Sequence, residues 1–85
     1  MFAVEWHTYA ILKLAQIERE AENPESVRAA AAHMDFNLRR MPHDMGESRE
    51  TPYRVWYADV LGLYYRVDDD ANKVIVLNAA KARRK

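Results

Sequence analysis

Arginine and aromatic side chains alternate along two short segments in the second half of the chain. Arg54 and Trp56 are two positions apart in one segment, and Tyr64 and Arg66 are two positions apart in the other. In a strand, such residues share a face. Guanidinium groups bind phosphate oxygens through paired hydrogen bonds and aromatic rings stack on bases, so this face would suit single-stranded RNA. The alternative is that these long side chains cover a sheet and pair with nearby carboxylates. Those carboxylates are Glu47, Glu50 and Asp59.

Other arrangements that could support chemistry are incomplete. Asp68, Asp70 and Asn72 have the spacing that opens a calcium-binding loop, but Lys73 replaces the required Gly and Ala79 replaces the closing Glu. We interpret this segment as a solvated hairpin turn. The sequence has no cysteine, and its three histidines lack the spacing of a metal site. We therefore expect neither a metal nor another cofactor.

The net charge is zero, but the charge is unevenly distributed. Residues 1–38 hold three basic and six acidic residues, whereas residues 39–85 hold ten basic and seven acidic ones. Basic residues crowd the last five positions, as Lys81, Arg83, Arg84 and Lys85. This tail either presents a positive field to phosphates or is simply solvated.

Length and composition predict one small folded domain over residues 1–85, with the basic tail at about 80–85. The apolar runs are only a few residues long, so we expect no membrane span, and the lack of cysteine suits the cytoplasm.

The first half of the chain has the pattern of a strand followed by two helices. Phe2, Val4 and Trp6 alternate with less apolar residues, as in a half-buried strand. Apolar residues then recur every three or four positions from a predicted N-cap at Thr8. Asn23 and Pro24 are a typical cap and first residue of a second helix, and Pro42 predicts its end near Arg40 or Met41. The short link between the helices predicts an antiparallel hairpin. The residues expected to form its core stripe are Ala10, Leu14, Ile17, Val27, Ala31, Met34 and Leu38.

The second half predicts a three-stranded antiparallel meander. Residues 43–52 are polar and are expected to be a loop or an irregular approach to the sheet. Aromatic and β-branched residues dominate the predicted strands at 53–58, 61–68 and 73–79, whose links are short enough only for hairpins. The architecture is therefore α+β, with a strand, a helical hairpin and a meander, and with the helices on one face of the sheet.

The alternation of each strand predicts which side chains meet the helices. Leu61, Leu63, Tyr65 and Val67 should face the helices, which places Tyr64 and Arg66 on the open face. If Val55 and Tyr57 also face the helices, Arg54 and Trp56 join Tyr64 and Arg66 on the open face.

Taken in order, these segments resemble the RelE/ParE superfamily, the toxin components of bacterial type II toxin–antitoxin pairs. The resemblance covers nearly the whole chain and rests on an ordered set of segments. These are 2–6, 38–42, 46–49, 65–67 and 74–77, followed by a basic end. It implies a β-α-α-β-β-β fold and a cognate antitoxin as partner. RelE-like members cut mRNA at the ribosome, and ParE-like members inhibit DNA gyrase.

The resemblance also implies roles for individual residues. Arg54 matches a basic position on the second strand of RelE-like members, and Lys81 and Arg84 match parts of their basic segment after the last strand. The third-strand Arg of the ribonucleases falls at Gly62, and a basic or His position falls near Ala82. RNA cleavage needs a proton acceptor, a cation at the phosphate and a leaving-group acid together. The cations are well represented, whereas the other two groups are not.

We therefore expect either a toxin acting on mRNA or another target, or a non-catalytic binding module that keeps the toxin scaffold. For a ribonuclease, the candidate catalytic residues are Arg54, Arg66, Glu47 and Tyr64. The candidate phosphate-binding residues are Arg54, Arg66, Lys81, Arg83 and Arg84.

Overall fold

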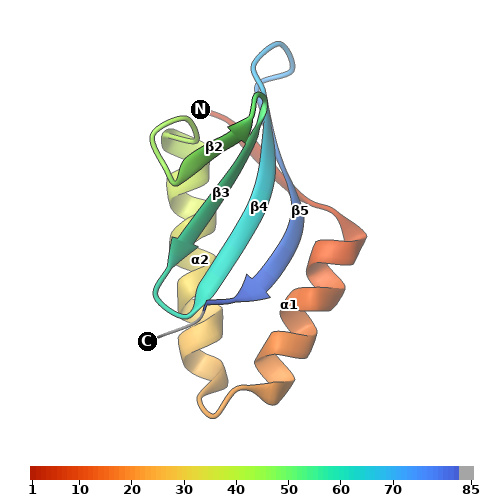
Figure 1. Ribbon diagram of the computed structural model, residues 1–85, viewed down its shortest axis with the longest axis vertical. Helices are drawn as coiled ribbons and strands as arrows, with labels where there is room; N and C mark the ends of the chain where they lie inside the picture. The colour runs from red at the N-terminus through yellow and green to blue at the C-terminus, as the bar shows by residue number, and fades with distance from the viewer. Residues whose placement is uncertain (83–85) are drawn as a thin grey trace.

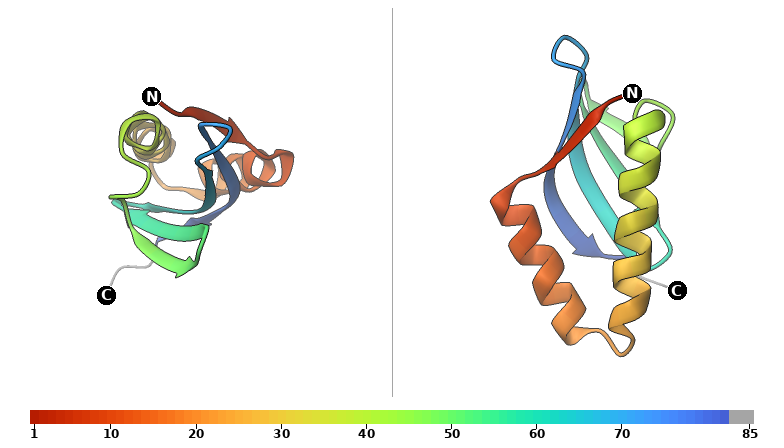
Figure 2. Two further views of the ribbon diagram at one scale, coloured as in Figure 1. Left: turned by 90° about the horizontal axis from the view of Figure 1, so that it is seen from above. Right: turned by 180° about the vertical axis from the view of Figure 1, so that it is seen from behind.

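Two helices cover one face of a five-stranded sheet in the computed structural model, which describes residues 1–82 (Figure 1). The elements in chain order are β1 (Ala3–Trp6), α1 (Thr8–Glu20), α2 (Pro24–Arg40), β2 (Glu47–Glu50), β3 (Tyr53–Ala58), β4 (Leu61–Asp68) and β5 (Lys73–Lys81). The strands lie in the order β1-β5-β4-β3-β2; β1 is parallel to β5, and the other neighbours are antiparallel. The α+β prediction is confirmed, and Figure 2 shows both helices on the same side of the sheet.

The helices begin at polar caps and meet at a tight turn. The Asn23 side chain accepts a hydrogen bond from the Glu25 amide at 3.1 Å, so the predicted cap of α2 is confirmed. The predicted cap of α1 is wrong by one residue, because His7 is the cap and its Nδ1 accepts from the Tyr9 amide at 3.2 Å. From the turn the helices diverge, as the rear view in Figure 2 shows.

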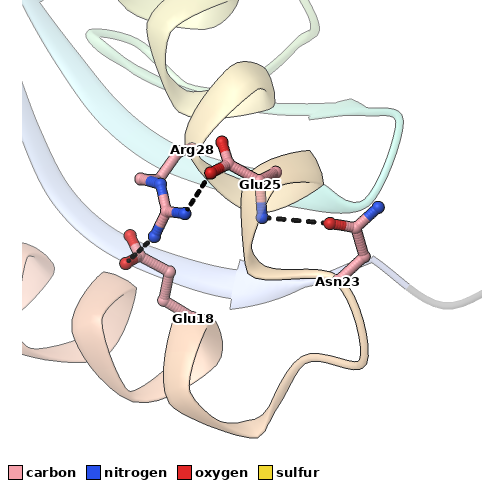
Figure 3. Close-up of polar contacts among 4 residues, drawn as sticks. All are labelled: Glu18, Asn23, Glu25 and Arg28. Carbon is pink, nitrogen blue, oxygen red and sulfur yellow. Dashed lines mark hydrogen bonds and ion pairs between the residues drawn. The ribbon is translucent and has the colours of Figure 1, made fainter.

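An arginine joins the two helices beside this turn (Figure 3). Arg28 of α2 forms ion pairs with Glu18 of α1 at 2.9 Å and with Glu25 of its own helix at 2.7 Å. The hydrogen bond that Arg28 donates to Glu25 is the largest cause that raises the pKa of the Arg28 guanidinium, and the bond that it donates to Glu18 adds to this effect. The group is exposed, so its effect on stability is small.

The core lies between the helices and the inward face of β4 and β5. As predicted, Leu61, Leu63, Tyr65 and Val67 are all buried. Val74, Val76 and Ala79 of β5 lie beside them, and the helices contribute Ala10, Ile17, Val27, Ala30, Met34 and Leu38. Leu14 and Ala31 were expected in this core but are only partly buried at its margin.

Strand β2 lies within a segment that was expected to be a loop, and this expectation is wrong. Its four residues are all exposed. Glu47, Ser48 and Glu50 pair with β3 at the edge of the sheet, with an irregularity between Ser48 and Glu50. The sequence shows no apolar alternation here because neither face of β2 is buried. Gly46 precedes it with φ +62°, and a Cβ there would lie 2.2 Å from the Val55 carbonyl oxygen. Glycine therefore lets the chain pass close to β3 as it enters the sheet.

Among residues 1–82, no helix has the length and apolar character needed to cross a membrane.

Candidate functional site

The register between β3 and β4 decides which side chains share the open face. Tyr57 is opposite Gly62, Val55 is opposite Tyr64 and Tyr53 is opposite Arg66. Directly opposed residues project to the same side of a sheet. The face away from the helices is therefore formed in β3 by tyrosines and valine, and Tyr64 and Arg66 lie there as predicted.

Arg54 and Trp56 lie on the other face, so the expectation that they join Tyr64 and Arg66 is wrong. Arg54 is opposite the buried Tyr65, and Trp56 is opposite the buried Leu63. Trp56 is half-buried against the core, and its ring centroid lies 6.3 Å from that of His33 on α2. The strand has apolar residues on both faces, so its own alternation does not decide between them.

The length of the hairpin between β3 and β4 shows which residues of β3 face the helices, which the alternation of β3 alone does not. Only Asp59 and Val60 separate the two strands, so Ala58 is opposite Leu61. Counting back from this pair places Trp56 opposite Leu63, on the core side. The two-residue link was recognisable in the sequence, and it would have assigned Arg54 to the helix side.

Arg54 supports the loop between α2 and β2. Its Nε donates to the Met45 carbonyl at 3.0 Å, and a terminal nitrogen donates to the Gly46 carbonyl at 3.3 Å. The Tyr65 hydroxyl lies 2.9 Å from the carbonyl oxygens of both Pro42 and Met45, to which it donates. Burial raises the pKa of Tyr65, and the neighbouring Arg54 opposes this in part. These contacts are structural, and they direct the Arg54 guanidinium to backbone carbonyls.

Three tyrosines form the most exposed aromatic surface of the open face, and we call it the tyrosine face (Tyr53, Tyr57 and Tyr64, around Gly62). The rings of Tyr53 and Tyr64 are stacked, with centroids 5.7 Å apart and planes inclined by 7°. Tyr57 is 60% exposed, and its ring lies so close to Gly62 that a Cβ there would be 2.3 Å from a ring carbon. A depression of about 200 Å³ lies between these rings and β5. Its lining includes Val55, Tyr57, Gly62, Tyr64, Asn78 and Ala80.

The cations on or beside the open face have carboxylate neighbours. Lys73 Nζ lies 2.9 Å from Glu5, and Arg49 lies 3.1 Å from Glu47. Arg66 lies 4.0 Å from Asp68, which is a weaker pair. Of the candidate catalytic residues, Glu47 therefore has an arginine partner, and Arg66 shares the open face with Tyr64, two positions along β4.

Among the residues that the structure describes, no other predicted phosphate-binding residue lies on the open face with Arg66. Lys81 is opposite the buried Leu61 and lines a pocket of about 450 Å³ beside the helix turn. Glu20 and Glu22 share that pocket. Arg83 and Arg84 lie outside the described residues. Within residues 1–82, no group of three His, Cys, Asp or Glu side chains is placed to hold a metal ion.

A second surface lies on the opposite side of the molecule, and we call it the helix groove (Trp6, Ile11, Leu14, Ala31, Ala32 and Phe36, with Asp35 and Arg39 at its margin). The groove has a volume of about 590 Å³ and is mainly apolar. Ile11 is 50% exposed and Phe36 is 57% exposed. Asp35 accepts from the Trp6 indole at 2.9 Å and from Arg39 at 2.6 Å, which fixes one margin.

Solved toxin structures have the same fold. No family model matches the sequence, and no curated protein matches it. A chain of the toxin–antitoxin complex RelBE2 from Mycobacterium tuberculosis is similar, with a TM-score of 0.77 and 24% identity over 95% of this chain and 98% of that one. The isolated E. coli RelE toxin is similar with a TM-score of 0.71 and 16% identity, over 100% of this chain and 88% of that one.

The chromosomal ParDE system of P. aeruginosa gives a TM-score of 0.66 and 15% identity, over 98% of both chains. The predicted resemblance is thus confirmed at the level of architecture: this chain has the RelE/ParE fold.

Proposed function

We propose that this protein is the toxin component of a type II toxin–antitoxin pair and that a small antitoxin restrains it in the bacterial cytoplasm. The observation that supports this most directly is the helix groove, which is mainly apolar and has a volume of about 590 Å³. The similar structures include toxin–antitoxin complexes, so a partner for such a surface is expected.

The groove has the shape and chemistry to receive an amphipathic helix. Ala31 and Ala32 have small side chains that let another backbone approach closely, while Ile11 and Phe36 expose large apolar side chains beside them. A helix binds such a surface through apolar residues spaced three and four apart. A segment that is disordered alone can supply that helix by folding as it binds.

Induced expression with and without its partner tests this proposal. The protein alone should arrest bacterial growth, and co-expression of a small reading frame adjacent to its gene should restore growth. Ala32→Glu places a charge in the lining of the groove and should abolish this rescue without abolishing the arrest. Ala29→Glu is the matched control, because Ala29 is exposed on the same helix and does not line the groove. Growth unaffected by the protein alone, or rescue that survives Ala32→Glu, would contradict the proposal.

Ribosome-dependent mRNA cleavage is the second candidate, and the open-face position of Tyr64 and Arg66 favours it. A cleaving site also needs a proton acceptor, and Glu47 is held by Arg49 at 3.1 Å. Arg54 is directed to the other face, so it is not placed to stabilise the same phosphate as Arg66. We therefore favour action through target binding and expect primer extension on cellular mRNA to show no cleavage sites that depend on Arg66.

A further inference from the structure

We propose that the tyrosine face is a docking surface for another protein, which inserts one apolar side chain into the depression beside Gly62. This inference deepens the proposed function, because it assigns the toxin's target to the class of proteins and its action to binding. The helix groove remains the antitoxin site, on the opposite side of the sheet.

The first support is the construction of the surface around Gly62. A side chain at this position would displace the Tyr57 ring, since even a Cβ would lie 2.3 Å from it. Glycine therefore allows Tyr57 to lie across the strand while remaining 60% exposed. In protein–protein interfaces, a few residues contribute most of the binding energy, and these are often aromatic side chains around small pockets. Tyrosine combines a large apolar area with a hydroxyl group and has few rotatable bonds to immobilise.

The second support is the balance of charge. Binding of nucleic acid depends on cations that neutralise phosphates, and its affinity falls steeply with salt. Here Lys73, Arg49 and Arg66 each have a carboxylate within 4.0 Å, so the surface offers little net positive charge to a phosphate backbone. The tyrosine face therefore matches a near-neutral protein surface with hydrogen-bonding groups at its rim better than it matches a nucleic acid.

The third support is the size of the depression. Its volume of about 200 Å³ is below the roughly 300–1,000 Å³ of pockets that enclose small-molecule ligands. It is open to solvent, and its lining includes the rings of Tyr57 and Tyr64 together with the small residues Gly62 and Ala80. Such a site accommodates one projecting aliphatic or aromatic side chain, and the surrounding tyrosines contact the partner's surface.

Photo-crosslinking in growing cells tests where the partner binds. Tyr57 is replaced by the photo-reactive residue p-benzoylphenylalanine, and Tyr9, which is 53% exposed on α1, receives the same replacement as control. We expect a discrete adduct from position 57 that resists ribonuclease and is digested by protease, with none of the same size from position 9. Adding Tyr64→Ala should reduce its yield about tenfold or more, as for a residue in a binding hot spot. No adduct, or an adduct unaffected by Tyr64→Ala, would overturn the proposal.

Two further measurements, growth arrest and antitoxin binding, distinguish a failure of this inference from a failure of the proposed function. Gly62→Arg and Tyr64→Ala should each abolish growth arrest while retaining antitoxin binding, and Tyr9→Ala should retain both. Arrest that persists in the first two variants would overturn the docking surface and leave the toxin assignment intact. If the unaltered protein causes no arrest, the proposed function fails, and the crosslink at position 57 still decides whether the surface docks a protein.

The alternative, that the tyrosine face binds RNA, is tested by measuring the binding of a fluorescent single-stranded oligoribonucleotide. We expect no binding that depends on Tyr57 or Tyr64 between 50 and 200 mM salt, the range over which phosphate-driven binding typically changes by orders of magnitude, roughly 10³–10⁵-fold for 6–10 contacts. Salt-sensitive binding that is lost in both Tyr57→Ala and Arg66→Ala would identify the face as a nucleic-acid surface and overturn the inference.

Discussion

At the scale of single residues, the position of Arg54 changes what its guanidinium is expected to do. It was a candidate phosphate ligand, and the structure directs it to the carbonyls of Met45 and Gly46. We expect Arg54→Ala to lower the free energy of unfolding by about 1–3 kcal/mol, because charged hydrogen bonds to the loop are lost. Urea denaturation measures this, with Arg49→Ala as an exposed control expected to change stability by under about 0.5 kcal/mol. Unchanged stability together with lost growth arrest would instead restore a functional role for Arg54.

The burial of Tyr65 predicts how the stability of the protein depends on pH. Burial raises the pKa of its hydroxyl in the folded protein, so the unfolded chain releases this proton first, near the ordinary value of about 10. The stabilising contribution of Tyr65 is therefore fully present below about pH 10 and is lost as the pH rises from there toward the folded pKa. The free energy of unfolding should fall above this pH, and Tyr65→Phe should flatten the fall. Tyr57→Phe is the exposed control, and parallel curves for Tyr65→Phe and the unaltered protein would contradict the assignment.

Gly62 and Tyr57 should be energetically coupled. Gly62→Ala should force the exposed Tyr57 ring outward, whereas the same change in a Tyr57→Ala background meets no ring. Because the two residues are in contact, their effects on unfolding should be non-additive by about 0.5 kcal/mol or more in a double-mutant cycle. Additive effects would show that the ring does not rest on this glycine in solution.

At the scale of elements, the helices contribute unequally to the sheet. Leu38 is completely buried, whereas Leu14 lies at the margin of the core and lines the helix groove. Leu38→Ala should destabilise by about 2–5 kcal/mol, and Leu14→Ala by less, under about 2 kcal/mol. Leu14→Ala should weaken antitoxin binding more than its small effect on stability explains. Equal destabilisation by both changes, measured by thermal unfolding, would contradict this division.

The elements also show what the sequence could and could not predict. The strand at 61–68 and the end of α2 at Arg40 were predicted correctly, because each combines a one-sided apolar pattern with a clear turn or proline. The strand at 53–58 was also predicted correctly, from its aromatic and β-branched residues and the short link that follows it. β2 was missed because a polar edge strand is specified by its neighbour rather than by its own pattern. The face of Arg54 was assigned wrongly because β3 is apolar on both sides, although the two-residue hairpin contained the register.

At the scale of the whole molecule, the two proposed binding surfaces lie on opposite sides of one thin sheet. The helix groove is formed by α1, α2 and β1, and the tyrosine face by β3, β4 and β5. An antitoxin helix in the groove would leave the tyrosine face uncovered. In the proposed toxin–antitoxin pair, neutralisation would then require either that the antitoxin chain continues around an edge of the sheet or that it holds this protein away from its target.

The parallel pairing of β1 with β5 has a consequence for the time at which this protein acquires its fold during synthesis. Ala3 is paired with Lys73, so β1 finds its neighbour only after the other described strands have been made. Until then the apolar sides of both helices lack much of the surface they cover, and closing so distant a contact is slow compared with forming a helix. The native sheet is therefore completed only after β5 has been made.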